Sequence, residues 1–325
     1  MHTPRRSIVR GIALAFLAAC TAFSAAAFPT KPIRILVTSS AGSNLDVFAR
    51  AVGEQMAQRL GQPVVVENVT GAGGLIAIRQ VARQSAPDGY TLLAASNTVA
   101  MAPAFKKDPG YDPLKDLVGI GDMQSVTYIL VGPATEPAKS AGEFITAAKA
   151  KPGTVPFGNG GIGTSTHVPA LMFAQQAGIQ VVHIPYKGNA PALPDIVGGR
   201  LHALWDAPGT VLPLIREGKL RAFGVSTAKR DPKFAEIPTM AEQGLPQFDF
   251  RAYLGILAPA ATPKDVVQKL SEALRAAIQS DKMREMYTKS ASSPGTMTAE
   301  EFTEFFRRDA VRSANLASEL GIEKD

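Results

Sequence analysis

The sequence predicts an α/β protein of two similar lobes, each a mainly parallel sheet flanked by helices. Strand, loop and helix patterns alternate through the first hundred residues, and the alternation restarts after a proline-rich stretch at residues 103–113. A strand, a Gly-rich loop and a helix also occur once in each half, near Gly42 and near Gly160. Such alternation favours parallel strands covered by helices. A ligand would bind between the lobes, beside the carboxyl ends of the strands.

The composition excludes several classes of protein. The 325 residues are 46% hydrophobic and 19% charged, which is too apolar for a disordered chain. Their number suggests about two domains. Cys20, the single cysteine, allows no intrachain disulfide and no cysteine-rich metal site. The net charge is +6, but the chain has no run of four Lys or Arg, so no nucleic-acid partner is expected.

Residues 1–27 have the pattern of a signal peptide. Arg5, Arg6 and Arg10 precede an uncharged run that begins at Gly11 and contains the small residues 25–27. These are the basic, apolar and cleavage regions of a secretory signal. Cleavage near Ala27 removes three of the 34 basic residues and none of the 28 acids, which leaves +3 on an exported, periplasmic chain.

Two other interpretations of this leader stay open. Residues 17–20 read Leu-Ala-Ala-Cys, which matches a bacterial lipobox and would place a lipid anchor on Cys20. The uncharged run also approaches the ~18 residues of a membrane helix. The apolar stretch after Cys20 and the Ala-rich run favour cleavage near Ala27 over both alternatives.

Apolar spacing and capping signals predict the individual elements. Apolar residues recur at helical spacing from Leu45 to Leu60 and stop at Gly61. Ser140 and Thr262 are predicted helix caps, and Thr298 with an acid three residues later is a capping box. Strands are predicted at 33–37, 64–66, 91–95, 126–131, 155–157, 181–184, 203–205, 222–225 and 253–257, and further helices at 75–84, 140–149, 165–177, 191–197, 262–280 and from 298 onward.

Three loops could bind an anion through backbone amides, at residues 40–44, 71–74 and 160–165. Their small residues let a ligand approach the backbone. Each loop precedes a helix, whose start presents unpaired N–H groups and the positive end of the helix dipole. Asp46 lies in the first turn after the first loop. The alternative is that these loops only make tight turns between strand and helix.

Further polar residues stand where predicted strands end. Ser96 and Asn97 follow the strand at 91–95, Tyr186 follows the one at 181–184, and Asp206 follows the one at 203–205. Ligands bind at this edge of a parallel sheet, so these side chains are candidate contacts. His167, at a helix start, is expected to donate a hydrogen bond to a ligand or to its own loop.

The patterns for catalysis and cofactors are incomplete. Gly158, Gly160 and Gly163 have dinucleotide-binding spacing, but no acid follows about 20 residues on. A nucleophile elbow around Ser165 needs Gly where His167 stands, so an exported hydrolase using Ser165 and His167 is only an alternative. The histidines fall on different elements without a carboxylate cluster, so neither a metal nor a cofactor is expected.

Eight sequence blocks occur in order along almost the whole chain after the leader. Two of these blocks read NVTGAGG at residues 68–74 and FGNGGIGTSTH at residues 157–167. The other blocks lie at residues 28–35, 87–93, 185–193, 218–222, 237–244 and 258–263. The ordered set resembles the receptors of tripartite tricarboxylate transporters, also called Bug receptors.

The resemblance implies a type II periplasmic-binding-protein (Venus flytrap) fold, whose lobes close over the ligand by a hinge motion. We expect residues 28–127 and 250–325 in lobe 1 and residues 128–249 in lobe 2. The implied ligand is a small carboxylate: a di- or tricarboxylate, an acidic amino acid or an aromatic acid. A monomer would deliver it to an inner-membrane permease, without catalysis. The alternative is a ligand-binding co-sensor for a membrane signalling protein.

The two matching loops and the strand ends make up the predicted ligand site. In the first loop Ser43 replaces the second glycine usual in the family, and Thr70 replaces a usual proline, so a relative's ligand does not transfer directly. The predicted contacts are Ser40, Ala41, Gly42, Ser43, Asn44, Asp46, Ser96, Asn97, Gly161, Gly163, Thr164, Ser165, His167, Tyr186 and Asp206.

Overall fold

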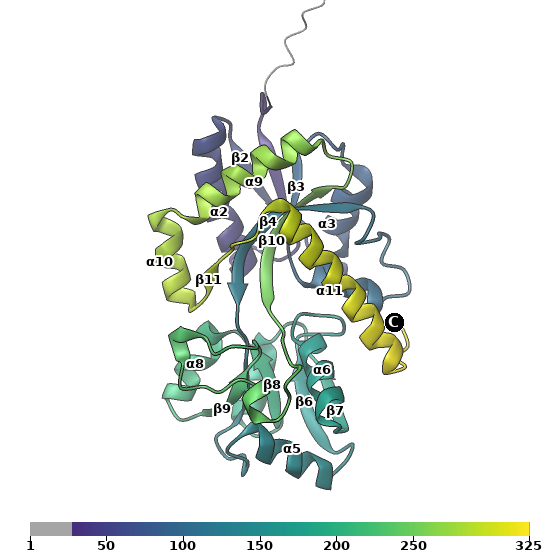
Figure 1. The fold of residues 1–325 in the computed structure, drawn as a ribbon, viewed down its shortest axis with the longest axis vertical. Helices are drawn as coiled ribbons and strands as arrows, with labels where there is room; N and C mark the ends of the chain where they lie inside the picture. Colours follow the sequence, from purple (N-terminus) through teal and green to yellow (C-terminus); the bar gives the residue numbers. More distant parts are fainter. Residues whose placement is uncertain (1–27, 325) are drawn as a thin grey trace, which may run out of the picture.

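The computed structural model describes residues 28–324, which form two α/β lobes, one above the other in Figure 1. Lobe 1 contains a six-stranded sheet of order β11-β4-β10-β3-β1-β2, and lobe 2 a five-stranded sheet of order β7-β6-β8-β5-β9. The chain passes into lobe 2 between β4 and β5 and returns between β9 and β10. The predicted two-lobed α/β fold is confirmed.

Lobe 1 is assembled from both ends of the chain. The elements of its first part are β1 (Ile33–Val37), α2 (Asn44–Leu60), β2 (Val64–Asn68), η1 (Ala72–Gly74), α3 (Leu75–Arg79), η2 (Gln80–Gln84), β3 (Thr91–Ser96), α4 (Thr98–Met101), η3 (Ala102–Ala104) and β4 (Leu117–Val126). The elements of its second part are β10 (Ala252–Pro259), α9 (Lys264–Ile278), α10 (Asp281–Ser290), β11 (Ser293–Pro294) and α11 (Ala299–Glu319).

Lobe 2 is formed by the middle of the chain. Its elements are β5 (Ile129–Pro133), α5 (Ala141–Ala150), β6 (Val155–Asn159), α6 (His167–Ala177), β7 (Val181–Pro185), η4 (Ala190–Ala192), α7 (Leu193–Val197), β8 (Ala203–Asp206), α8 (Pro208–Arg216), β9 (Leu220–Val225), η5 (Pro232–Phe234) and η6 (Ala241–Gln243).

Both sheets are mixed rather than mainly parallel, which corrects that part of the prediction. Strands β1, β2 and β3 run parallel, as do β6, β7 and β8. Strand β10 is antiparallel to β3 and β4, and β5 is antiparallel to β8 and β9. The reason is the chain connectivity. Strands β5 and β10 begin at the junction between the lobes, whereas their neighbours β8 and β3 run toward it.

The strand predicted at residues 126–131 is wrong, because the chain crosses between the lobes within it. Strand β4 ends at Val126 and β5 begins at Ile129. Between them the Tyr128 amide donates to Ser226 Oγ at 2.9 Å, and the Ser226 amide donates to the Tyr128 carbonyl at 2.9 Å. The two crossing segments are therefore tied together at the junction.

Helix caps set where most of the long helices begin. Ser43 caps α2, Ser140 caps α5 and Thr298 opens α11 with a complete capping box. The predicted cap at Thr262 is wrong: its hydroxyl donates to the Pro259 carbonyl at 2.7 Å, and Pro263 occupies the N-cap of α9 without a side-chain bond. No helix in residues 28–324 is long and apolar enough to cross a membrane.

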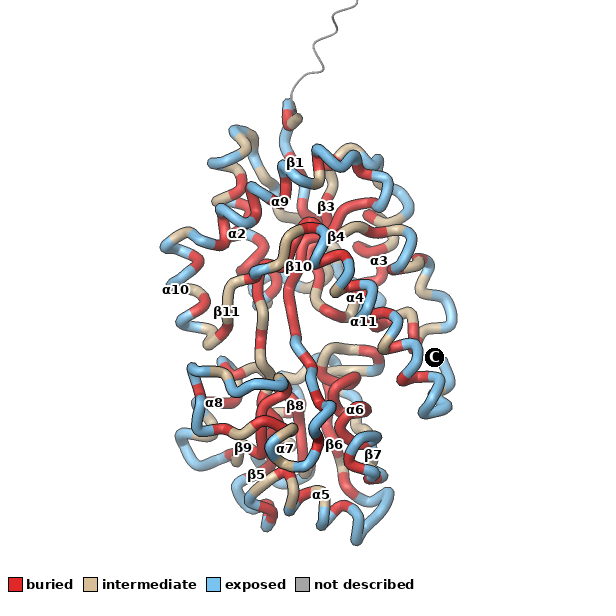
Figure 2. Tube along the Cα trace, in the orientation of Figure 1, coloured by how far each residue is buried: buried red, intermediate tan, exposed pale blue. Residues whose placement is uncertain are grey.

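The central strands of both sheets are buried, whereas the helices keep an exposed outer side (Figure 2).

Helix α11 packs on both lobes. Phe302 and Phe306, in its first half, share a core cluster with residues of β3 and β10 in lobe 1. Leu316, in its second half, belongs to the cluster that contains Met172 of α6 in lobe 2. Motion of one lobe against the other must therefore act on α11.

Candidate ligand-binding site

The first predicted loop, residues 40–44, overlaps the segment 39–43 (the Ser loop), which joins β1 to α2. The last residue of the predicted loop, Asn44, begins α2. Ser43 Oγ accepts from the Asp46 amide at 3.3 Å and lies 2.6 Å from Ser39 Oγ. The amides of Ser40, Ala41 and Asn44 donate to no group within residues 28–324. These three N–H groups remain available to a ligand at the start of a 17-residue helix.

Asp46 shapes the Ser loop rather than facing a ligand. Its buried carboxylate accepts from the Gly42 amide and from Asn68 Nδ2, both at 2.8 Å, and pairs with Arg50 at 2.9 Å. Burial alone would raise the pKa of this carboxyl, but the hydrogen bonds from Arg50, Gly42 and Asn68 outweigh it and lower the pKa below its usual value. The Gly42 amide, a predicted ligand donor, is thereby occupied.

The third predicted loop, residues 160–165, lies within the segment 160–166 (the Gly loop), which joins β6 to α6. Its own side chains satisfy several of its amides. The Gly160 amide donates to Thr166 Oγ1 and the Gly161 amide to Asn159 Oδ1, each at 2.9 Å. The Gly163 amide donates to His167 Nδ1 at 3.2 Å. The Thr164 amide donates to the Gly161 carbonyl at 3.3 Å. The remaining three amides of the loop, those of Ile162, Ser165 and Thr166, make no hydrogen bond to any described residue.

His167 stabilises the Gly loop as a neutral acceptor, so the predicted donor role is wrong at its Nδ1 atom. The ring is buried and packs edge-on against Phe105 of lobe 1, with 5.6 Å between ring centroids. Burial, with a smaller effect of His183, lowers the pKa of His167 to about 3. Ser165 Oγ lies 3.1 Å from the Tyr128 hydroxyl, and no hydrogen bond joins it to His167 among the described residues.

Two buried side chains at the ends of β6 and β8 have a polar atom without a partner in residues 28–324. These atoms are Asn159 Nδ2 and Asp206 Oδ2. The other Asp206 oxygen accepts from the Ala207 amide at 2.7 Å. Burial raises the pKa of Asp206 to about 6. The predicted position of Asp206 at a strand end is confirmed. Asn159 was not predicted, although it is the third residue of the block at residues 157–167.

Three other predicted contacts are bound to neighbouring protein groups. Ser96 Oγ donates to Thr98 Oγ1 at 3.2 Å. The side chain of Asn97 is fully buried. Its Nδ2 donates to Asp309 Oδ2 at 2.9 Å, and its Oδ1 accepts from the backbone amide of Tyr253 at 2.7 Å. The Tyr186 hydroxyl donates to Asp195 at 2.5 Å. Asn97 thus joins β3, β10 and α11 rather than facing a cleft.

The remaining Gly-rich loop, at residues 71–74, lies beside the Ser loop. A Cβ added at Gly74 would come within 2.9 Å of Thr38 Cβ. The helix that follows, α3, continues without a break into η2 and ends at Gln84. The close approach of Gly74 to Thr38 shows that this loop packs against the end of β1.

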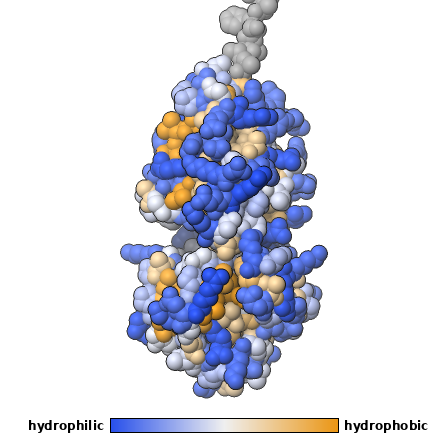
Figure 3. Space-filling model, turned by 90° about the vertical axis from the view of Figure 1, so that its left-hand side faces the viewer, coloured by the Kyte–Doolittle hydropathy of each residue, from blue (hydrophilic) through white to orange (hydrophobic). Residues whose placement is uncertain are grey.

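The lobes approach each other on both sides of the junction. A Cβ added at Gly163 of the Gly loop would lie 3.1 Å from the Phe105 ring of lobe 1, and one at Gly209 of α8 would lie 3.3 Å from the Ser290 carbonyl. Figure 3 shows the surface hollowed at the waist between the lobes. The interlobe groove on one side has a volume of about 770 Å³ and is lined by Thr127, Lys229, Arg251 and Ser293, among others.

The chemistry of the two loops is that of an anion receptor. Each lobe offers free amides and hydroxyls at a helix start, and neither loop contains a basic side chain. No group of three or more His, Cys, Asp or Glu able to hold a metal occurs in the part of the chain that the structure describes. Two α/β lobes that each carry such a loop, joined by two crossing segments, have the architecture of a solute-binding protein.

The chain belongs to the tripartite tricarboxylate transporter receptor family, whose model matches residues 48–322. It is 33% identical to BugT of Bordetella pertussis over 325 residues, which covers 99% of both chains. It is 34% identical to the UPF0065 protein in the gbd 5' region of Cupriavidus necator over 297 residues, which covers 91% of this chain and 90% of that one. It is thus a periplasmic solute-binding receptor.

Solved structures agree with this assignment. The periplasmic binding protein BugD has 32% identity and a TM-score of 0.77, covering 92% of this chain and all of that one. An R. palustris protein with adipate has 27% identity and a TM-score of 0.79, with 92% and 100% covered. MatC from Rhodopseudomonas palustris with bound malate has 27% identity and a TM-score of 0.76, with 89% and 99% covered. The family consists of receptors, so the hydrolase alternative is excluded.

Proposed function

We propose that this receptor captures a small carboxylate, with a dicarboxylate as the first candidate, and delivers it to a tripartite permease in the inner membrane. The observation that carries the proposal is the pair of helix-start loops, one from each lobe, whose free amides suit a carboxylate without any basic side chain. The adipate and malate held by two relatives support the choice of a dicarboxylate.

The proposed contacts are the free amides of Ser40, Ala41, Asn44 and Ser165. The side chains of Ser43, Asn44, Thr164 and Ser165 lie beside them in the two loops. Asp206 adds a buried carboxyl oxygen without a partner within residues 28–324. Gly42, Gly161, Gly163, Asp46 and His167 hold the loops in shape, since the glycine amides, the Asp46 carboxylate and His167 Nδ1 are already paired. Ser96, Asn97 and Tyr186 support the surrounding elements.

The proposed lobe boundaries are residues 28–127 with 250–325, and residues 128–249. Membership of the two sheets supports this division, and the tied segments at Tyr128 and Ser226 supply the hinge. The lobes of a monomer would close because the closed state binds the ligand more tightly than the open state. The leader at residues 1–27, with cleavage near Ala27 or a lipid on Cys20, lies outside the described residues.

The test is thermal unfolding of the purified protein with mono-, di-, tri- and aromatic carboxylates at millimolar concentration. A ligand at 100 times its Kd adds about 2.7 kcal/mol of stability, which shifts Tm by several degrees. We expect at least one dicarboxylate to raise Tm, and the uncharged diamide of the same acid to have no effect. If no carboxylate raises Tm, the proposal fails.

A further inference from the structure

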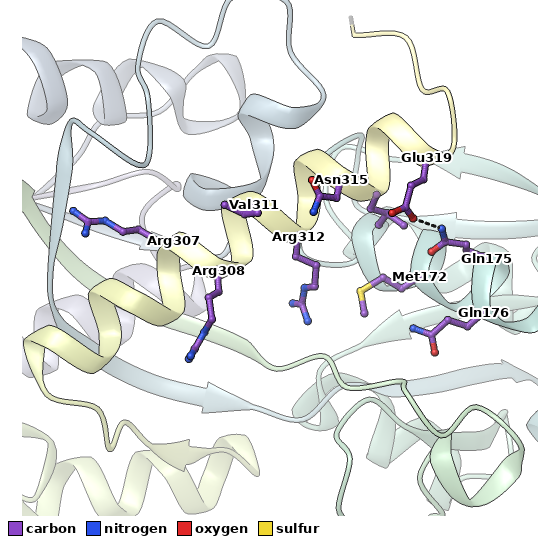
Figure 4. Close-up of a pocket in the computed structure, with 10 residues that line it drawn as sticks. Met172, Gln175, Gln176, Arg307, Arg308, Val311, Arg312, Asn315 and Glu319 are labelled. Atoms are coloured by element: carbon purple, nitrogen blue, oxygen red, sulfur yellow. Dashed lines mark hydrogen bonds between the residues drawn. The ribbon is translucent and has the colours of Figure 1, made fainter.

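A groove of about 550 Å³ lies between α6 and α11, away from the Ser and Gly loops. Figure 4 shows Arg308 and Arg312 projecting from the same side of α11, with Met172 pointing from α6 toward the space beside Arg312. Gln175 and Gln176 of α6 form the opposite edge. We call it the arginine groove, because three of its lining residues are Arg307, Arg308 and Arg312.

Two of the three arginines in the groove lack a charged partner among the described residues. Arg307 and Arg308 are exposed and make no hydrogen bond or close ion pair with any residue in 28–324. Arg312 is already engaged, because it pairs with Asp309 at 2.7 Å and donates to the Asp249 carbonyl at 3.0 Å. The one acid in the lining is Glu319, which accepts from Gln175 Nε2 at 2.7 Å at the far end. The groove is therefore complementary to negative charge.

The groove also has an apolar component and considerable length. Val311 is 46% exposed and lines the groove together with Met172. Glu319 is the twelfth residue after Arg307 in α11, which places the two about 18 Å apart along the helix axis. A single small carboxylate is too short to use that length. A peptide segment that alternates acidic and apolar side chains would fill it.

We infer that the arginine groove docks an acidic segment of a protein partner. The position suits a partner that responds to bound ligand, because α6 begins at the Gly loop and α11 packs on both lobes. Lobe closure would shift α6 against the first half of α11 and change the groove. Docking itself is independent of the proposed ligand chemistry; only this coupling rests on the proposed function.

The experiment measures fluorescence anisotropy of a short labelled peptide of alternating Glu and Leu, titrated with the purified protein. The double variant Arg307→Glu/Arg308→Glu should bind about tenfold more weakly or worse, since two ion pairs are replaced by repulsion. The matched control is Lys149→Glu/Lys151→Glu, which changes the net charge equally at the exposed end of α5 in lobe 2. It should bind like the unaltered protein.

Three outcomes would overturn the inference. One is equal binding of the peptide by all three proteins, and another is an equal loss in both double variants, which would mean nonspecific charge attraction. The third is arginine-dependent binding to phosphatidylglycerol vesicles without binding to the peptide, which would indicate a lipid surface instead. Tm and the carboxylate shifts should be unchanged in the arginine variant. A failed carboxylate panel with intact peptide binding would reject the proposed function alone.

Discussion

The hydroxyl of Ser165 in the Gly loop lies 3.1 Å from the hydroxyl of Tyr128 in the first crossing segment. Tyr128 is also bonded to Ser226 in the second crossing segment, and its ring lies 6.2 Å from that of Phe250. Burial raises the pKa of Tyr128 to about 12, so the hydroxyl stays neutral and keeps its hydrogen bond throughout the physiological range. The Tyr128 side chain thus joins the proposed hinge to the candidate ligand loop.

Tyr128→Phe should weaken carboxylate binding about three- to tenfold, because the Ser165 hydroxyl loses a hydrogen bond worth about 1 kcal/mol and the Gly loop becomes less ordered. Calorimetric titration with the best carboxylate measures this. The matched control is Tyr287→Phe, which removes a buried hydroxyl bonded to the Met123 carbonyl within lobe 1. It should lower Tm but leave the Kd unchanged. Equal affinities of both variants would contradict a role for the Tyr128–Ser165 contact.

Substitutions of Ser43 should separate its capping role from its effect on the ligand. Ser43→Ala removes the N-cap of α2 and should cost about 1 kcal/mol of unfolding free energy, whereas Ser43→Gly should cost only a few tenths. Urea unfolding at neutral pH measures both. If Ser43 contacts the ligand, the Ser43→Ala and Ser43→Gly variants should bind it equally weakly, although their stabilities differ. If instead only the less stable variant binds more weakly, the role of Ser43 is limited to capping α2.

The Ser and Gly loops could be predicted because their signals are local. Small residues before a helix place free amides at its start, whatever the rest of the chain does. Which amides remain free depends on side chains a few positions further on. Asp46 occupies the Gly42 amide and His167 occupies the Gly163 amide, so the glycines themselves are not the donors. That part required the three-dimensional structure.

Features that depend on distant packing could not be predicted from the sequence. Asn97 was correctly placed at a strand end, but its partner Asp309 is 212 residues away, and the side chain is directed there instead of into a cleft. Residues 126–131 are mostly apolar, which hid the break at the crossing. Helix α8 was missed because Gly209 and Pro213 interrupt its helical signals.

Asp46→Asn should destabilise the protein by about 2 kcal/mol near pH 7, since a buried carboxylate bonded to three donors is replaced by a neutral amide. The folded-state pKa of Asp46 lies below the unfolded value. Its contribution is therefore present above about pH 4 and is lost as the pH falls through the folded-state pKa. Tm of the wild type and the variant should converge on acidification. A constant difference would contradict the assigned role.

Asp206→Asn should have the opposite pH dependence. The pKa of Asp206 is raised from 3.8 to about 6, so the folded protein retains a proton that the unfolded chain releases between those values. The free energy of unfolding of the wild type therefore falls as the pH rises through this window. The loss is at most about 3 kcal/mol, because a shift of one pKa unit corresponds to about 1.4 kcal/mol. The variant removes the buried charge and should gain stability relative to the wild type between about pH 4 and pH 7.

The same substitution tests whether Asp206 meets the ligand. Its unpaired oxygen is buried at the end of β8, and an ionised carboxylate there would repel a ligand carboxylate. Binding by the wild type should then tighten as the pH falls from about 7 to about 5, because protonated Asp206 can donate a hydrogen bond. Binding by Asp206→Asn should be nearly independent of pH over this range. Parallel pH profiles of the two proteins would place Asp206 outside the ligand site, while leaving the predicted stability difference intact.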